Sequence, residues 1–127
     1  MNPKYAQLIL RAGLSFVFLW FGLNQTLDQS MWVSLIPDSI VSLTGLSAKT
    51  IVICNGVFEV VMAILLVLGI RVRVVALLLV LHMFTIIWDL GLNAIAVRDI
   101  GLMFALLSVA FAGPDDYCLR SNIPVVK

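Results

Sequence analysis

Four long apolar segments, separated by shorter polar ones, make up most of this chain. They cover about residues 5–27, 50–69, 74–88 and 100–113. A helix rises 1.5 Å per residue, so about 20 residues cross the roughly 30 Å hydrocarbon core of a bilayer. The pattern predicts one all-α domain over residues 1–127, an integral membrane four-helix bundle.

Residues 28–49 have a different pattern, in which short apolar groups alternate with polar residues. Pro37, Asp38 and Gly45 interrupt this segment, so it is too broken to span a bilayer. Its apolar side chains predict an interfacial segment that lies on the membrane surface, with Trp32 at the depth of the lipid headgroups.

Polar and small side chains recur at helical spacing inside the predicted spans. Residues three or four positions apart share one face of a helix, and small residues let neighbouring helices approach closely. These faces are therefore expected to point into the bundle. They contain, span by span, Arg11, Ser15, Phe18, Gly22 and Gln25; Asn55, Glu59, Met62 and Ala63; His82, Thr85 and Asp89; and Gly101, Ala105, Ser108 and Ala112.

Glu59 places an acidic side chain inside the second apolar segment. At the bilayer centre such a group costs on the order of 3 kcal/mol on insertion scales, so it is expected to face a partner or a cavity. Counting residues puts Glu59 and His82 near the midplane on adjacent antiparallel helices. Arg11 can extend inward from the first span, so depth alone allows a cluster of all three. Two interpretations stay open: a structural network, or a site for a ligand or a proton.

Arg98 and Asp99 precede the fourth apolar segment, which is short because Pro114 forbids its simple continuation. A length of roughly 20 Å implies local thinning of the bilayer or burial of this charged pair at the bundle edge. The alternative is an ordinary helix start, where Asp99 is favoured by the positive end of the helix dipole.

The composition excludes several classes of protein. With 62% hydrophobic and 12% charged residues among 127, the chain cannot form a water-soluble surface. A net charge of +1 gives no electrostatic basis for binding nucleic acid. One histidine and two cysteines are too few for a usual haem or zinc site, so no metal is expected. Cys54 and Cys118 are expected on opposite sides of the membrane, where they cannot form a disulfide.

The distribution of Lys and Arg predicts the orientation in the membrane. With four spans, six of these residues fall on the side of both termini and two on the other side, which puts both termini in the cytoplasm of a cell with a cytoplasmic (inner) membrane. The six are Lys4, Arg11, Arg71, Arg73, Arg120 and Lys127, and the two are Lys49 and Arg98.

Three short motifs, in order, resemble those of the DoxX family over nearly the whole chain. They are Arg11-Ala12-Gly13-Leu14 with Phe21-Gly22-Leu23, Gly56-Val57-Phe58-Glu59 followed by Leu68-Gly69-Ile70-Arg71, and Val97-Arg98-Asp99-Ile100-Gly101-Leu102. The resemblance implies a four-helix membrane bundle associated with redox systems. Its relatives include quinone-linked thiosulfate oxidation subunits and a membrane oxidoreductase complex that handles thiols and superoxide. By motif match, Arg11, Glu59, Arg98 and Asp99 carry over, whereas His82 rests on depth alone.

The resulting hypothesis is a quinone-interacting membrane subunit of a thiosulfate- or thiol-type redox complex. The chain would not be an autonomous enzyme, because a soluble partner subunit would have to supply electrons. The expected proton-exchanging residues are Glu59, His82, Arg98 and Asp99. The residues expected to bind the quinone are Arg11, Asn55, Phe58, Met62 and Trp88.

Other functions fit the same sequence. One is a non-catalytic membrane scaffold or assembly protein, in which the polar cluster only fixes the helix register. Transport of a small solute or protons is less favoured, because four short helices enclose little pore volume unless several copies of the chain assemble. The lipid bilayer, a soluble redox subunit and further copies of the chain are thus the partners considered.

Overall fold

The computed structural model describes residues 2–119, which form six helices and no strand. Each of four long helices is long and apolar enough to cross a membrane. These are α1 (Pro3–Leu27), α4 (Ala48–Leu68), α5 (Val72–Leu90) and α6 (Ala94–Ala112); α2 (Ser30–Val33) and α3 (Asp38–Thr44) are short. The predicted all-α membrane fold is confirmed.

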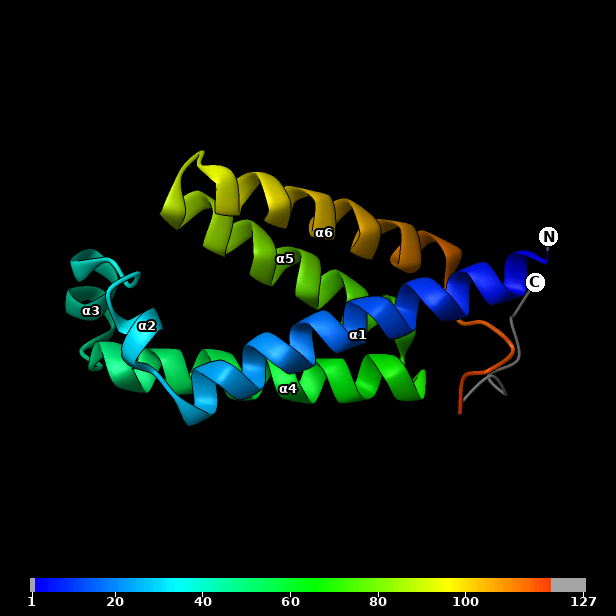
Figure 1. Cartoon of the computed structure of the whole chain (residues 1–127), viewed down its shortest axis with the longest axis horizontal. Coiled ribbons are helices and arrows are strands. Elements are labelled where there is room, and N and C mark those ends of the chain that lie inside the picture. The colour runs from blue at the N-terminus through cyan, green and yellow to red at the C-terminus, as the bar shows by residue number, and fades with distance from the viewer. Residues whose placement is uncertain (1, 120–127) are drawn as a thin grey trace.

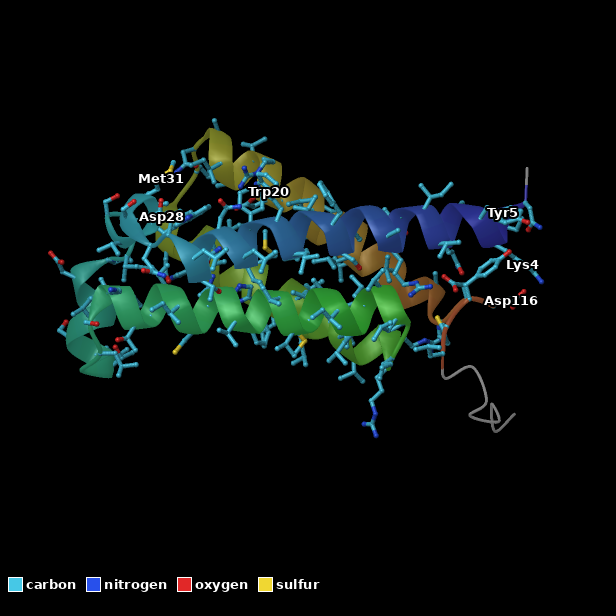
Figure 2. The ribbon with its side chains drawn as sticks, turned by 60° about the horizontal axis from the view of Figure 1, so that its bottom comes forward. Lys4, Tyr5, Trp20, Asp28, Met31 and Asp116 are labelled. Atoms are coloured by element: carbon cyan, nitrogen blue, oxygen red, sulfur yellow. The ribbon has the colours of Figure 1, made fainter. Side chains whose placement is uncertain are left out.

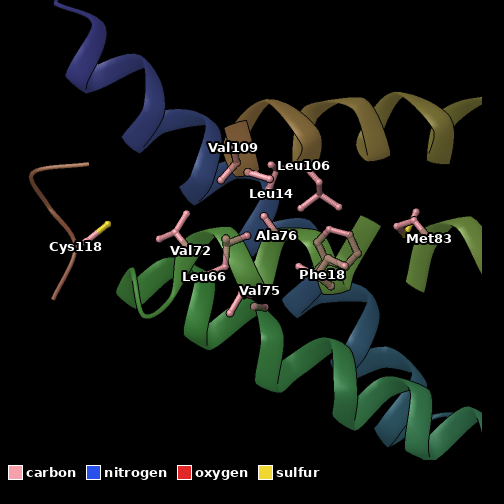
Figure 3. Close-up of a cluster of buried hydrophobic side chains, with 13 residues drawn as sticks. Leu14, Phe18, Leu66, Val72, Val75, Ala76, Met83, Leu106, Val109 and Cys118 are labelled. Atoms are coloured by element: carbon pink, nitrogen blue, oxygen red, sulfur yellow. The ribbon is translucent and has the colours of Figure 1, made fainter. Parts of the chain in front are cut away.

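The long helices form two pairs, α1 with α4 and α5 with α6. The pairs meet near the end that holds the N-terminus and diverge toward α2 and α3 (Figure 1). The main apolar core fills the part where they meet, and Figure 3 shows it between the helices. Its buried side chains include Leu14, Phe18, Leu66, Val72, Ala76, Leu79, Leu106 and Val109. The separation of the pairs at the other end leaves room for a cavity.

α1 and α4 touch through glycine. A Cβ built on Gly22 would lie 2.7 Å from the carbonyl oxygen of Gly56, and one built on Gly56 would lie 2.7 Å from that of Gly22. No larger residue fits at either position without moving the backbone. The inward face predicted for α1 is confirmed: its buried residues include Arg11, Ser15, Phe18, Gly22 and Gln25.

The face predicted for the last span is wrong. α6 buries Ala96, Asp99, Leu106, Val109 and Ala110, while Gly101, Ser108 and Ala112 of the predicted small-residue face are exposed. Larger apolar side chains bury more surface against neighbouring helices than small ones do. The packed face of this helix therefore contains Leu106 and Val109 together with Ala96 and Ala110, and not the small residues that were predicted.

α6 is also longer than expected. It begins at Ala94, where the side chain of Asn93 accepts a hydrogen bond from the backbone N–H of Ala96. Its 19 residues measure about 28 Å, enough to cross the hydrocarbon core without thinning. Arg98 and Asp99 therefore lie inside the helix and not at its start.

The segment between α1 and α4 folds into α2 and α3 at the end of the bundle far from the N-terminus (Figure 1). Neither short helix buries a residue. The ring of Trp32 packs edge-on against Phe21 of α1, with 5.8 Å between ring centroids. Its position at the headgroup level of a membrane stays a prediction.

At the opposite end, the segment after α6 folds back onto α1 and α4. Figure 2 shows Lys4 and Tyr5 of α1 beside Asp116. Lys4 forms an ion pair with Asp116, and the backbone N–H of Leu119 donates to the carbonyl oxygen of Leu68 at 3.1 Å. The described C-terminal segment therefore lies at the same end as the N-terminus, as four spans require.

Candidate functional site: an intramembrane cavity around Glu59 and His82

A cavity of about 290 Å³ lies between the two helix pairs, with the α2–α3 segment forming one of its walls. All four long helices contribute to the lining, and most lining residues are apolar. Three aromatic rings, those of Phe18, Phe21 and Trp32, belong to this apolar wall. The polar residues of the lining are Gln25, Asn55, Glu59, His82, Thr85, Asp89, Arg98 and Asp99.

Glu59 lies on the cavity wall near the middle of α4 and is only 3% exposed. Its carboxylate oxygen Oε1 lies 3.1 Å from His82 Nε2 and accepts from Asn55 Nδ2 at 3.3 Å. The other oxygen, Oε2, accepts from Gln25 Nε2 at 3.2 Å. Asn55 Nδ2 also donates to Gln25 Oε1 at 2.6 Å, which closes the network. A buried carboxylate is thus held by side chains from three helices.

Local helix geometry explains this network. Asn55 and Glu59 are four residues apart and share one face of α4. Gln25 is three residues from Gly22, on the face of α1 that the glycine contact presses against α4. That close approach brings the Gln25 side chain within hydrogen-bond distance of Glu59. The ring of Phe58 packs 4.8 Å from the His82 ring and limits how the imidazole can turn.

The donors around Glu59 suit an ionised carboxylate. An ionised carboxylate only accepts hydrogen bonds, and here each of its oxygens accepts an amide N–H. His82 Nε2 then carries the hydrogen that lies between it and Glu59. With an imidazolium at His82 the pair is neutral, which reduces the cost of burying both charges.

A second charged pair lines the cavity from α6. Arg98 donates to Asp99 Oδ1 from Nε at 3.0 Å and from Nη2 at 2.9 Å. The guanidinium lies 5.0 Å from the centroid of the Phe21 ring, a distance at which a cation attracts an aromatic face. Asp99 is buried while the Arg98 side chain is half exposed, so the pair runs from the cavity wall toward the protein surface.

Five of the nine residues predicted for the site therefore lie around one cavity: Asn55, Glu59, His82, Arg98 and Asp99. Phe58 reaches this group only through the His82 ring. Met62 packs at the margin of the apolar core, and Trp88 is 78% exposed beside Phe84. Neither Met62 nor Trp88 lines the cavity.

The predicted cluster of Arg11 with Glu59 and His82 is wrong. Arg11 binds Asp115 through two hydrogen bonds of 3.1 Å, and its Nη1 donates to the carbonyl oxygens of Leu66 and Val67 at 2.7 Å each. It lies 14 residues before Gln25, the α1 residue that contacts Glu59, or about 21 Å along the helix. No side chain spans that distance.

Sequence reasoning also missed three residues of the cavity. Gln25 lay on a predicted inward face, but it was not recognised as a donor to Glu59. Phe21 and Trp32 are the others. The sequence feature that could have indicated them is one aromatic residue near the end of the first span and another in the segment that follows it. Asp115, the partner of Arg11, follows the last span and gave no signal of burial.

The two cysteines do not contact each other. Cys54 is exposed on α4, and Cys118 is buried against Gly69 near the opposite end of the bundle, so both are free. Among residues 2–119, no group of three His, Cys, Asp or Glu side chains is placed to hold a metal ion.

Comparison with known proteins identifies the family. The DoxX family model matches residues 6–92, from α1 through α5. No curated protein and no solved structure matches the chain. The family match ends before α6, so the third of the DoxX-like motifs, with Arg98 and Asp99, lies outside it. Because the match covers more than half of the chain, this protein is a member of the DoxX family.

Proposed function

We propose that this protein is the quinone-interacting membrane subunit of a redox complex that oxidises thiosulfate or a thiol. The observation that carries the proposal is the Glu59–His82 pair, which is buried in the wall of an apolar cavity inside a membrane bundle. A paired carboxylate and imidazole can exchange a proton with a ligand that enters from the lipid.

The shape and lining of the cavity favour a flat, largely apolar ligand. Its volume is at the lower end of the range for small-molecule sites, enough for a ring but not for a long tail. The rings of Phe18, Phe21 and Trp32 are part of the lining and give it an aromatic, apolar character. The isoprenoid tail would then extend between the diverging helix pairs into the bilayer.

Reduction of a bound quinone adds two electrons and two protons and yields the quinol. A soluble partner subunit supplies the two electrons as it oxidises its thiosulfate or thiol substrate. His82 would hold one proton within reach of a ring oxygen, and the Glu59 carboxylate 3.1 Å from its Nε2 would orient the imidazole for that transfer. Asp99, on α6 beside the helix that carries His82, would pass a second proton, taken up from water, to the other ring oxygen.

The orientation proposed for this subunit puts both termini in the cytoplasm. Lys4, Arg11, Arg71 and Arg73 gather at the end that holds the N-terminus, and Lys49 and Arg98 belong to the other end. Arg120 and Lys127, which also entered the charge count, lie outside the described residues. In this orientation the cavity opens toward the outer half of the cytoplasmic membrane.

The direct test is to purify the full chain in a mild detergent, extract it with solvent and identify bound quinone by mass spectrometry. Binding is then measured in nanodiscs with a variant in which Trp20→Phe and Trp88→Phe leave Trp32 as the fluorescent probe of the cavity. We expect co-purifying quinone and saturable quenching of Trp32, both reduced by Glu59→Gln. The matched control is Asp38→Asn, an exposed acid of α3 outside the cavity. No quinone in the extract together with no saturable quenching would overturn the proposal.

One observation favours a second function, a non-catalytic membrane scaffold. Every fully buried side-chain nitrogen and oxygen among the described residues has a hydrogen-bond partner, so the Glu59 network is complete without a ligand. In that case Glu59→Gln lowers the yield of folded protein and leaves the activity of the assembled complex unchanged. A quinone site requires the activity itself to fall.

A further inference from the structure

We infer that the cavity binds the quinol more tightly than the quinone, because Asp99 offers an unused carboxylate oxygen to a ring hydroxyl. This inference rests on the proposed quinone site and adds which redox form that site prefers.

Asp99 has one engaged oxygen and one that has no partner. Both hydrogen bonds from Arg98 go to Oδ1. No group among residues 2–119 donates a hydrogen bond to Oδ2. Every fully buried side-chain oxygen of the described residues has a hydrogen-bond partner. Since Oδ2 has none, it is not fully buried. Asp99 is 5% exposed and is one of the residues that line the cavity, so its carboxylate belongs to the cavity wall.

The charges around the cavity argue that the missing donor is a neutral one. The Asp99 carboxylate is already paired with Arg98, and Glu59 is held by His82 and two amides. The third acid of the lining, Asp89, is exposed to solvent. No buried carboxylate of the cavity therefore lacks a compensating group, and a cationic ligand is not required. A hydroxyl that donates to Oδ2 would form a short, charge-assisted hydrogen bond.

The two redox forms of the ligand differ in this respect. The oxygens of a quinone only accept hydrogen bonds, so one of them would face the lone pairs of Oδ2. Both oxygens of a quinol carry a hydrogen that can be donated. His82 lies eight residues before the end of α5, and Asp99 lies five residues after the start of the adjacent α6. Their depths thus differ by about 4–5 Å, which lets one ring lie against both residues.

The experiment uses the full chain in nanodiscs under anaerobic conditions, with Trp32 as the probe. A short-tailed benzoquinone is the ligand that quenches fluorescence. Its quinol and the dimethyl ether of that quinol are competitors, the ether having the same shape but no hydrogen to donate. A hydrogen bond to a charged acceptor predicts that the quinol binds about tenfold more tightly than the ether and the quinone.

Asp99→Asn supplies the matching variant. An amide whose oxygen accepts from Arg98 turns its N–H group to the cavity, so the preference for quinol is expected to disappear or reverse toward quinone. Asp38→Asn, an exposed acid outside the cavity, should keep it.

Equal affinities of wild-type protein for quinol and ether would overturn this inference and leave the quinone site standing. Absence of binding by all three compounds would overturn both. If Asp99→Asn does not fold, the comparison of the three ligands on wild-type protein still decides the question.

Discussion

Gly22 and Gly56 lie against each other where α1 crosses α4. A Cβ built on either glycine would lie 2.7 Å from the carbonyl oxygen of the other. The same crossing brings Gln25 to Glu59. The packing of two glycines and the hydrogen bonding of the buried carboxylate are therefore one structural feature.

Replacement of Gly22 by Ala is expected to destabilise the fold. The new Cβ would meet backbone atoms of Gly56 and Val60, which cannot rotate away as a side chain can. Overpacking of this kind costs about 1–3 kcal/mol. The unfolding midpoint in a detergent titration should fall accordingly, and quinone binding should weaken because Gln25 moves from Glu59.

Gly13→Ala is the matched control for this substitution. It lies on the same helix, and nothing is within 4 Å of its added Cβ. Alanine has the higher helix propensity, so this variant should be as stable as wild type or slightly more stable. Equal losses in the two variants would show that the Gly22–Gly56 contact does not determine the helix crossing.

The Arg11–Asp115 pair should contribute strongly to stability. Both side chains are only 2% exposed, and Arg11 also binds two carbonyl oxygens at the end of α4. Arg11→Met would leave the Asp115 carboxylate buried without its partner, a loss of about 3–5 kcal/mol. Thermal unfolding followed by circular dichroism measures this effect.

Two comparisons check its origin. Lys4→Met removes the exposed ion pair with Asp116 and should have a small effect. The double variant Arg11→Met with Asp115→Leu should recover stability relative to Arg11→Met alone, because no unpaired charge remains. If the double variant is less stable than Arg11→Met alone and Asp115→Leu alone, the loss of stability does not come from an uncompensated charge.

The sequence predicts what depends on composition and depth. Long, mostly apolar runs identified the four long helices, because backbone groups in lipid must be satisfied within a helix. Counting residues from the span ends put Glu59 and His82 at similar depth, and the structure joins them at 3.1 Å. A fixed rise per residue makes depth readable from a sequence.

What could not be predicted depends on side-chain partners and on helix ends. Asp115 follows the last span and reads as part of a polar tail until the chain folds back onto Arg11. The start of α6 was missed because Arg98 and Asp99 interrupt the apolar pattern. Their mutual hydrogen bonds allow the charges inside the helix, and the signal for the true start was the Asn93 cap.

Cys118 should be unreactive in the folded protein. Burial raises the pKa of its thiol, an effect that a backbone hydrogen bond at Asp115 and the nearby Arg11 only partly offset. At neutral pH the reactive thiolate is therefore scarcer than for a free cysteine. Because folding favours the neutral thiol, the free energy of unfolding falls as pH rises from the ordinary thiol pKa toward the raised one.

The measurement is thiol alkylation in a Cys54→Ser background. The alkylation rate of Cys118 should stay low until the pH is well alkaline and should rise on unfolding. Fast labelling of folded protein at neutral pH would contradict this burial.

The proposed orientation predicts opposite labelling of the two ends of the bundle. In a background of Cys54→Ser and Cys118→Ser, we expect Asp116→Cys to react with a membrane-impermeant maleimide only in inverted vesicles. Asp38→Cys on α3 should react in intact cells, because α2 and α3 lie at the far end from Asp116 (Figures 1 and 2). The excess of Lys and Arg at the terminal end is the physical reason, since positively charged loops are retained in the cytoplasm. The reverse pattern would turn the cavity to the cytoplasmic half of the membrane, and labelling of both sites from one side would contradict four spans.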